Sequence, residues 1–528
     1  MPTEVSEKFV EICFSRANIT IEDVVAIACQ KAGVALDGSA MFRSRIQAGA
    51  DLVDQILTQD GVIYGVTTGY GDSCEVDIPA ALIAELPRQL YTYHGCGLGR
   101  NFDEMQTRAI LVARLTSLCK GWSGVSLLLL ETLTALLRAD LLPVMPSEGS
   151  VGASGDLTPL SYLAAALCGE REVWCNGVQM PAEIALRTAG ITPLVLRPKE
   201  GLAIMNGTAA MTGLACLAYR RAEYLGRLCA RITALASFAL DANPEHFDEA
   251  LFSAKPHAGM QQVAGWIRSD LGSEAAGKPR NSERLQDRYS IRCAPHVIGV
   301  LIDALPWMKR DIENELNSAN DNPLVDIESG RILHGGHFYG GHIAFVMDSM
   351  KNAVANLADL MDRQMALLVD GRYNNGLPAN LSGAVGARKA INHGLKALQI
   401  GASAWTAEAL KLTMPASVFS RSTECHNQDK VSMGTIAARD CLRIIELVEQ
   451  VAAAMLVTVR QGVALRVASG HALQAGPCSS MYRQLEATIP FLDQDRRLDL
   501  ELRQLITGIQ GEIWDMRDPC DGQIQNAG

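Results

Sequence analysis

The sequence predicts a mainly α-helical protein, in which a core bundle of long helices accompanies a smaller N-terminal region of mixed structure. Three observations predict this fold. Apolar residues recur at steps of three and four along 346–368 and again along 441–459, and 209–240 is a long apolar stretch nearly free of glycine and proline. Such steps follow the turn of a helix, so each stretch forms one long helix. Helices of this length predict a bundle.

The same long segments predict assembly with further copies of the chain. A helix on the surface of a monomer shows a single apolar stripe, whereas these segments are rich in alanine on their other faces as well. We therefore expect additional burial against other subunits, and we predict a homo-oligomer.

The first 200 residues have shorter helical patterns and two glycine loops, at 64–71 and 94–99. Strands are expected only at 172–178 and near Leu194. Neither loop matches the dinucleotide fingerprint, because Gly95, Gly97 and Gly99 alternate strictly. The expected division is an N-terminal region at 1–205, a central long-helix bundle at 206–480 and a C-terminal helical segment at 481–528. The segment 268–281 is expected to be an exposed loop.

Composition excludes several classes of protein. A formal net charge of -11 and the lack of basic runs argue against a nucleic-acid surface. The most apolar run, 125–145, contains Glu131, Arg138 and Asp140, so a buried helix explains it better than a membrane span. Fourteen cysteines occur without a C-x-x-C pair, which is typical of reduced thiols in a cytoplasm, and no metal site is expected. The partner is a small molecule or a protein.

The most informative segment is Gly152-Ala153-Ser154-Gly155-Asp156. Because Gly155 has no Cβ, its nitrogen can approach the carbonyl of Ala153 and close a five-membered ring, and dehydration would leave an electrophile. Thr158 is a good N-cap for the apolar run 160–167, whose positive end would face the ring. A serine hydrolase is disfavoured, since its G-x-S-x-G elbow needs a glycine where Asp156 stands. A plain turn remains the other interpretation.

Polar residues cluster at other apolar places in the chain. The residues that stand out are Asn206, Tyr289, Arg292, Asn322 and Gln428. Singly, each has a structural explanation, such as an Asn-Pro turn or a helix cap. Together they supply an arginine for a carboxylate, amides to hold it and a phenol able to act as a base.

The histidines at 334, 337 and 342 lie among glycines. Their spacing does not match two ligands on one helix and no carboxylate lies among them, so packing or substrate contact is expected rather than metal binding.

These motifs, in this order, resemble the aromatic amino acid ammonia-lyases and aminomutases over roughly residues 20 to 520. The resemblance rests on the Ala153-Ser154-Gly155 core, the Tyr64 loop and the motifs 205–208, 289–292, 320–323 and 427–429. It implies the cofactor MIO, 4-methylideneimidazole-5-one, formed from that triplet, a homotetramer of long helices and active sites drawn from three subunits.

The resemblance also implies roles for individual residues. Tyr64, on its loop, is the base that removes the substrate β-proton, while the methylidene carbon derived from Ser154 holds the amine. Arg292 pairs with the substrate carboxylate beside Asn206 and Asn322. Further positions matching the family's active site are Gly71, Tyr289 and Phe338. A tyrosine titrates near 10, so we expect a positive helix end and the substrate ammonium to lower the pKa of Tyr64.

Two residues before the second glycine loop contact the substrate ring in this family, and here they are Tyr93 and His94. Leaving two polar tips unpaired against a bare phenyl ring would cost about 1 to 3 kcal/mol each, so a phenol is favoured. We expect a bacterial-type, cytoplasmic ammonia-lyase that converts L-tyrosine into trans-4-coumarate.

Other functions remain open at this stage. A histidine ammonia-lyase that forms urocanate is the first alternative, although Gln428 stands where such enzymes usually carry a glutamate. A tyrosine 2,3-aminomutase would use the same residues. A helical scaffold without chemistry and a metal hydrolase are the remaining classes.

Overall fold

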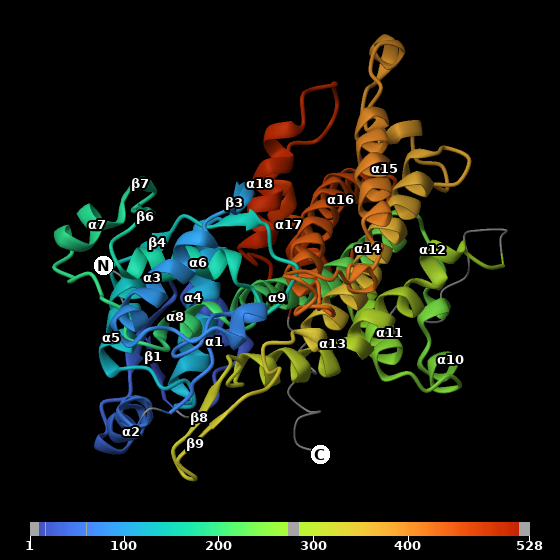
Figure 1. The fold of residues 1–528 in the computed structure, drawn as a ribbon. Helices are drawn as coiled ribbons and strands as arrows, with labels where there is room; N and C mark the ends of the chain where they lie inside the picture. Colours follow the sequence, from blue (N-terminus) through green and yellow to red (C-terminus); the bar gives the residue numbers. More distant parts are fainter. Residues whose placement is uncertain (1–9, 16, 60, 273–284, 517–528) are drawn as a thin grey trace. The chain divides into compact units, whose positions relative to one another are not determined.

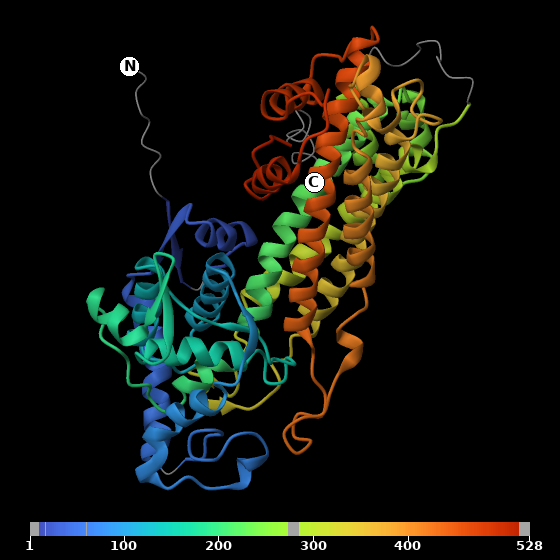
Figure 2. The ribbon, with the colours of Figure 1, turned by 90° about the horizontal axis from the view of Figure 1, so that it is seen from above.

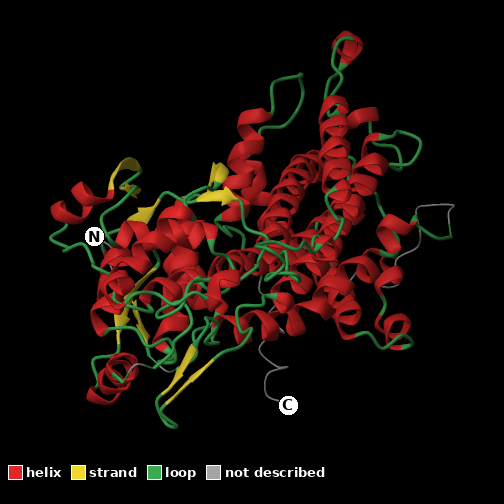
Figure 3. Cartoon of the chain, viewed as in Figure 1, coloured by secondary structure: helices red, strands yellow, loops and turns green. Residues whose placement is uncertain are grey.

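Helices make up most of the chain, and the strands are few and short (Figure 3). The structure, a computed structural model, describes residues 10–15, 17–59, 61–272 and 285–516. The mainly α-helical class predicted from the sequence is confirmed. Of the segment expected to be an exposed loop, the first residues instead end helix α11 (Ala258–Leu271), and 273–281 lies outside the described residues.

The chain forms two compact units, each assembled from separate stretches of sequence. Unit 1 comprises Met1–Arg220, Met308–Asp348 and Pro415–Arg439, and unit 2 comprises Arg221–Trp307, Ser349–Met414 and Asp440–Gly528. Helices with residues in both units are α9 (Ala209–Ala239), α13 (Ala294–Leu316), α14 (Gly341–Val369) and α16 (Gly434–Ala468). The division at residues 205 and 480 follows pattern changes along the sequence and stays a prediction.

Unit 1 contains most of the shorter elements (Figure 1). Its helices are α1 (Ile21–Ala28), α2 (Ala40–Thr58), α3 (Leu86–Tyr93), α4 (Glu104–Cys119), α5 (Leu127–Arg138), α6 (Thr158–Leu167), α7 (Ala182–Thr188) and α8 (Glu200–Met205). Its strands are β1 (Val10–Phe14), β2 (Ala32–Leu36), β3 (Leu98–Asn101), β4 (Leu141–Pro143), β5 (Pro146–Glu148), β6 (Glu172–Cys175), β7 (Val178–Pro181), β8 (Leu324–Asp326) and β9 (Arg331–Leu333).

The strands of unit 1 differ from the sequence expectation. The strand expected at 172–178 is an antiparallel hairpin, β6 and β7, which β4 extends to three strands. No strand forms at Leu194. This residue is buried, and its amide donates a backbone hydrogen bond to the carbonyl of Leu167 at the end of α6. The other strands form three two-stranded sheets. In two of these sheets, β1–β2 and β3–β5, the paired strands are far apart in sequence, so no local sequence pattern predicts the pairing.

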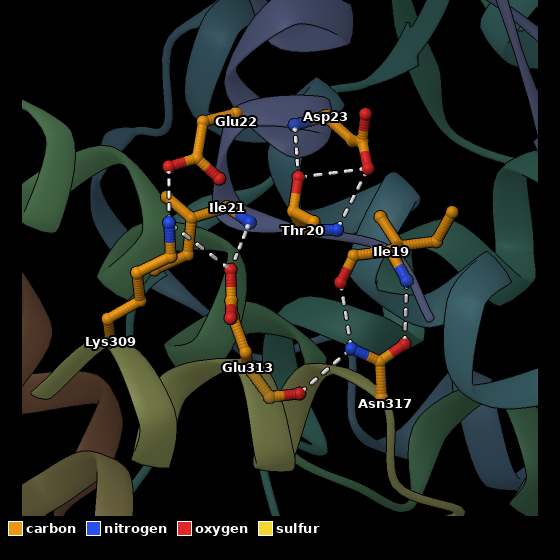
Figure 4. A network of polar contacts seen from close by, with 8 residues as sticks. All are labelled: Ile19, Thr20, Ile21, Glu22, Asp23, Lys309, Glu313 and Asn317. Atoms are coloured by element: carbon orange, nitrogen blue, oxygen red, sulfur yellow. Dashed lines mark hydrogen bonds and ion pairs between the residues drawn. The ribbon is translucent and has the colours of Figure 1, made fainter. Parts of the chain in front are cut away.

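A polar network fixes the C-terminal part of α13 against the start of α1 (Figure 4). Thr20 caps α1 in a capping box with Asp23. Asn317, directly after the end of α13, exchanges two hydrogen bonds of 2.8 Å with the backbone of Ile19, and Lys309 of α13 donates to Glu22. Because Asn317 is held in this way, the segment 318–322 leaves α13 at a defined place within unit 1.

Unit 2 contains the bundle, in which the long helices lie side by side (Figures 1 and 2). Arg221 of α9 makes a two-pronged contact of 2.8 Å with Glu449 of α16, and Gln364 of α14 donates to Thr233 of α9. The remaining α-helices of the unit are α10 (Glu249–Ser253), α11, α12 (Tyr289–Arg292), α15 (Lys396–Lys411), α17 (Pro477–Thr488) and α18 (Asp499–Gln510).

The predicted long helices are confirmed as α9, α14 and α16. The residues of the two predicted stripes are at most 1% exposed: Val346, Met350, Val354, Leu357, Met361, Met365 and Leu368 in α14, and Cys441, Ile445, Val448, Ala452, Met455 and Val459 in α16. Burial of each Val, Leu, Ile or Met side chain among them stabilises the fold by about 1.5 to 3 kcal/mol. The apolar run 125–145 is shorter as a helix than expected, because α5 ends at Arg138 and β4 follows.

Among the residues that the structure describes, one helical stretch, Tyr289–Leu316, is long and apolar enough to cross a membrane by length and composition, with a mean hydropathy of 1.2 and 44% of its most apolar part buried. The core helix of a globular bundle meets the same criteria, so the stretch carries no conclusion about a membrane.

Candidate active site

The triplet Ala153-Ser154-Gly155 lies in the loop between β5 and α6, paired by backbone with Gly207. The Gly207 amide donates to the Ser154 carbonyl at 3.1 Å, and the Asp156 amide donates to the Gly207 carbonyl at 2.8 Å. Ala153 and Gly155 are buried, whereas Ser154 is partly exposed. The fold thus fixes the backbone on both sides of Ser154 without burying the residue completely.

The triplet fits the formation of MIO. Gly155 has a φ of +79°, and a Cβ there would lie 2.0 Å from the Gly207 carbonyl oxygen, so only glycine fits this pairing. Within the described ranges the Gly155 amide donates to no residue, which leaves its nitrogen available for ring closure. Next to Gly207, the buried Oδ1 atom of Asn206 has no hydrogen-bond partner among the described residues. A buried acceptor of this kind suits a group formed or bound beside it.

Asp156, directly after the triplet, is fully buried and caps helix α9. Its Oδ2 atom accepts from the amides of Ala210 and Met211 at 2.7 and 3.1 Å, and its other oxygen accepts from Thr435. Burial raises the pKa of Asp156 to about 6 even though these hydrogen bonds oppose the shift. The amides that Asn206 would satisfy as a helix cap are therefore taken by Asp156, and Asn206 instead ends α8.

The expected cap of α6 is wrong by one position. The helix begins at Thr158, after Leu157, which provides no side-chain cap. Thr158 donates instead to the carbonyl of Gly149 across the loop that holds the triplet. The Thr158 hydroxyl therefore links the two sides of the loop and does not cap the helix.

Arg114 and Asn320, which the sequence interpretation missed, lie behind the triplet's partner segment. The fully buried guanidinium of Arg114 donates to the Asn206 carbonyl at 2.9 Å and to Asn320 Oδ1 at 3.1 Å. Burial lowers the pKa of Arg114, and the carboxylates of Asp321 and Asp156 oppose the shift. A charged residue inside the apolar run of α4 was the signal that would have found it.

Tyr64 lies in a glycine turn before Gly71 and is half-buried. The Gly71 amide donates to the Tyr64 hydroxyl oxygen at 2.6 Å. The pKa of Tyr64 is nevertheless raised, first by burial and then by the nearby Glu424 carboxylate, whereas the Gly71 bond lowers it. Burial and the Glu424 charge thus outweigh the Gly71 bond, and the expected lowering of the Tyr64 pKa by a substrate ammonium stays a prediction.

Gln428 joins the triplet through its side chain. Its Nε2 atom donates to Ser154 Oγ at 3.4 Å, and its backbone pairs with Thr423 in a short hairpin. The same hairpin brings Glu424, a third residue that the sequence interpretation missed, to Gly71. An exposed acid in a polar loop gave no signal of this role.

Tyr93 and His94 close helix α3, with ring centroids 4.3 Å apart. His94 Nδ1 donates to the Leu90 carbonyl at 2.9 Å, which leaves Nε2 as the acceptor of a neutral ring. Burial lowers the pKa of His94, so the neutral form is favoured at pH 7. The pKa of Tyr93 is raised by burial and by Glu424. The pair presents a phenol and an imidazole acceptor.

The remaining predicted residues are less closely connected to the triplet. Asn322 Oδ1 accepts from the Gly335 amide at 2.8 Å, at a cavity of about 420 Å³ that His334 and His337 also line. Phe338 is half-buried on the same loop, and its place at the substrate stays a prediction. Tyr289 and Arg292 lie in unit 2, where the guanidinium stacks 4.6 Å from the Tyr289 ring, and their contribution to this site stays a prediction.

The histidine loop is close to a buried carboxylate from α13. Burial raises the pKa of Glu315, while His342 and His337 oppose that shift, and Thr208 donates to its carboxylate at 2.6 Å. Across the part of the chain that the structure describes, no group of three metal-ligating side chains is close enough to hold an ion.

Comparison with known proteins identifies the family. Residues 19–487 match the family model of aromatic amino acid lyases. The chain is similar to the histidine ammonia-lyase of Geobacillus thermodenitrificans (strain NG80-2), 39% identical over 84% of this chain and 86% of that protein. It is 36% identical to the histidine ammonia-lyase of Bacillus subtilis (strain 168), over 94% of this chain and 96% of the relative.

A solved structure supports the same conclusion. The tyrosine aminomutase from Streptomyces globisporus is 32% identical, with a TM-score of 0.88, covering 96% of this chain and 98% of that one. The chain therefore belongs to the aromatic amino acid lyase family. It is a carbon–nitrogen lyase.

The prediction of L-tyrosine as substrate is contradicted by these relatives. The similar proteins that cover most of this chain at 35–39% identity are histidine ammonia-lyases. The physical argument failed because Tyr93 and His94 do not discriminate between the two rings. A neutral His94 accepts a hydrogen bond from an imidazole N–H as well as from a phenol O–H.

Proposed function

We propose that this protein is a histidine ammonia-lyase, which converts L-histidine into urocanate and ammonia. The similarity to histidine ammonia-lyases over 84–94% of the chain carries the proposal. The site geometry supports it, because the buried, neutral His94 offers a hydrogen-bond acceptor that suits an imidazole N–H.

Ala153, Ser154 and Gly155 form MIO in this proposal, and the group supplies an electrophile for the substrate amine. The chain's own residues hold that triplet in place. Gly207 fixes its backbone, Asp156 anchors it to the start of α9, and Gln428 contacts the serine hydroxyl. The unpaired Oδ1 of Asn206 is available to the substrate or to the triplet.

Tyr64 is the proposed base for the β-proton. Its hydroxyl oxygen already accepts the Gly71 amide proton, a hydrogen bond that strengthens as the phenol loses its own proton. The substrate ammonium would offset the raised pKa of Tyr64 by favouring the phenolate.

Binding of the substrate carboxylate is assigned to Arg292, with Asn206 and Asn322 beside it, and Tyr289, Gly71 and Phe338 complete the proposed pocket. We also propose a homotetramer in which other subunits complete the site, and a cytoplasmic location.

Purified protein incubated separately with L-histidine, L-tyrosine and L-phenylalanine tests the proposal. Urocanate should form from histidine, and mass measurement of the triplet peptide should show the loss of two waters. A Ser154→Ala variant is the control, since it cannot form the electrophile. An intact triplet would overturn the lyase mechanism, and coumarate from tyrosine without urocanate from histidine would overturn the substrate assignment.

A further inference from the structure

A single hairpin, residues 423–428, contacts both the tyrosine turn and the triplet. Thr423 and Gln428 exchange backbone hydrogen bonds of 3.0 and 3.2 Å, and the Thr423 hydroxyl donates to Gln428 Oε1 at 2.8 Å. The Gln428 amide then reaches Ser154. The base of the hairpin is thus fixed beside the triplet.

At the other end of the contact, the carboxylate of Glu424 lies on the backbone of Gly71 and Asp72. The Asp72 amide donates to Glu424 Oε1 at 3.1 Å. A Cβ on Gly71 would lie 1.4 Å from that same oxygen, so the carboxylate occupies the space that any side chain at Gly71 would take. The second oxygen of Glu424 accepts from Asn427 at 3.2 Å, which orients the carboxylate.

Gly71 connects this carboxylate to the proposed base. The Gly71 amide donates to Tyr64, and the next amide, that of Asp72, donates to Glu424. Two adjacent amides therefore hold the phenol on one side and the hairpin on the other. A displacement of Glu424 would move the donor on which the position of the Tyr64 oxygen depends.

The backbone of the hairpin is unusual at this point. Glu424, Cys425 and His426 have φ values of +50°, +52° and +68°, and none is glycine. A left-handed conformation is unfavourable for a residue with a Cβ, so it persists only where its surroundings hold it. The contacts of Glu424, Asn427 and Gln428 supply that hold.

We propose that Glu424 is a positioning residue, whose carboxylate holds the Gly71–Asp72 backbone and thereby keeps the Tyr64 phenol in register with the triplet. This inference rests on the proposed function for the role of Tyr64 as base. Glu424 itself touches neither the triplet nor, in this proposal, the reacting atoms.

Three variants test the proposal in the full-length protein. Glu424→Ala removes the carboxylate, Glu424→Gln keeps an acceptor for the Asp72 amide, and Glu75→Ala removes an exposed carboxylate from the same segment as a matched control. Glu424→Ala should lower kcat with histidine at least tenfold, with little change in KM, since misplacement of a reacting group lowers rate by up to about 10²-fold. Glu424→Gln should restore most of kcat.

Hydrogen exchange on the peptide spanning Tyr64 to Asp72 supplies a readout that does not depend on the substrate. Exchange at this peptide should be faster in Glu424→Ala and unchanged in Glu424→Gln and Glu75→Ala. Wild-type kcat and exchange in Glu424→Ala, or equal losses in the Ala and Gln variants, would overturn the positioning role. Failure of the wild type to act on histidine would overturn only the proposed substrate, because the exchange comparison still decides the role of Glu424.

Discussion

Substitution of Gly155 by alanine should disrupt the triplet by a defined amount. The residue's φ of +79° alone costs an alanine about 1 kcal/mol. The new Cβ would also lie 2.0 Å from the Gly207 carbonyl oxygen, whereas ordinary contact begins near 3.4 Å. The two backbone segments must therefore separate, which breaks the bonds between Gly207 and its partners Ser154 and Asp156.

The expected cost follows from these losses. Each of the two buried backbone hydrogen bonds contributes about 1 kcal/mol, and up to about 3 kcal/mol when a partner stays unsatisfied. The total for Gly155→Ala is then about 3 to 7 kcal/mol. Gly190→Ala provides the matched control, since Gly190 has a φ of +70° but no atom within 4 Å of a Cβ there. It should cost only about 1 kcal/mol.

Thermal unfolding and mass spectrometry of the triplet peptide measure the two effects. Gly155→Ala should unfold several degrees below Gly190→Ala and should retain both waters at the triplet, with no detectable urocanate formation. If Gly155→Ala matured fully and unfolded at the same temperature as Gly190→Ala, the pairing of Gly155 with Gly207 would not hold the triplet as described.

Three further outcomes are expected. Ser154→Ala should abolish turnover while gel filtration shows unchanged assembly. If this variant kept the activity of the wild type, the serine would have no part in the mechanism. Burial raises the pKa of Asp156 in the folded protein to about 6, whereas the unfolded chain loses this proton near pH 4. The free energy of unfolding should therefore fall by roughly 3 kcal/mol as the pH rises from about 4 to 6. Denaturant unfolding of Asp156→Asn should lack this loss, and an identical pH dependence would contradict the assignment. Glu424→Gln should move the acidic limb of the kcat/KM profile to lower pH, since the Glu424 charge raises the pKa of Tyr64, which Cys74, Tyr70 and Tyr93 also face. If the acidic limb did not move, the group that titrates there would not be Tyr64.

The sequence predicted the elements whose information is local. The stripe from Val346 to Leu368 specifies α14 because every residue in it is buried on one face, and the small residues around Ser154 mark a backbone that must approach closely. Strand β3 was not predicted because it forms by pairing with β5, which lies more than 40 residues further along the chain.

The site residues that were missed could not be predicted because their roles depend on contacts that only the fold creates. Asn320 was hidden beside Asn322, which looked equivalent in sequence, and only the fold places Asn320 against Arg114 and the backbone of Thr208. Glu424 resembles an ordinary surface acid until three left-handed residues turn it onto Gly71. The substrate ring could not be chosen from Tyr93 and His94, because a neutral imidazole acceptor serves a phenol and an imidazole alike.

The pairing of Gly155 with Gly207 separates two kinds of evolutionary change in this protein. Main-chain atoms hold the backbone of the triplet, and a substitution at Tyr93 or His94 alters none of them directly. Tyr93 and His94, at the end of a different helix, are free to vary without disturbing that pairing. Substitutions at the end of α3 can therefore change the side chains there while the backbone around Ser154 is kept, and the chain is similar both to a histidine ammonia-lyase and to a tyrosine aminomutase.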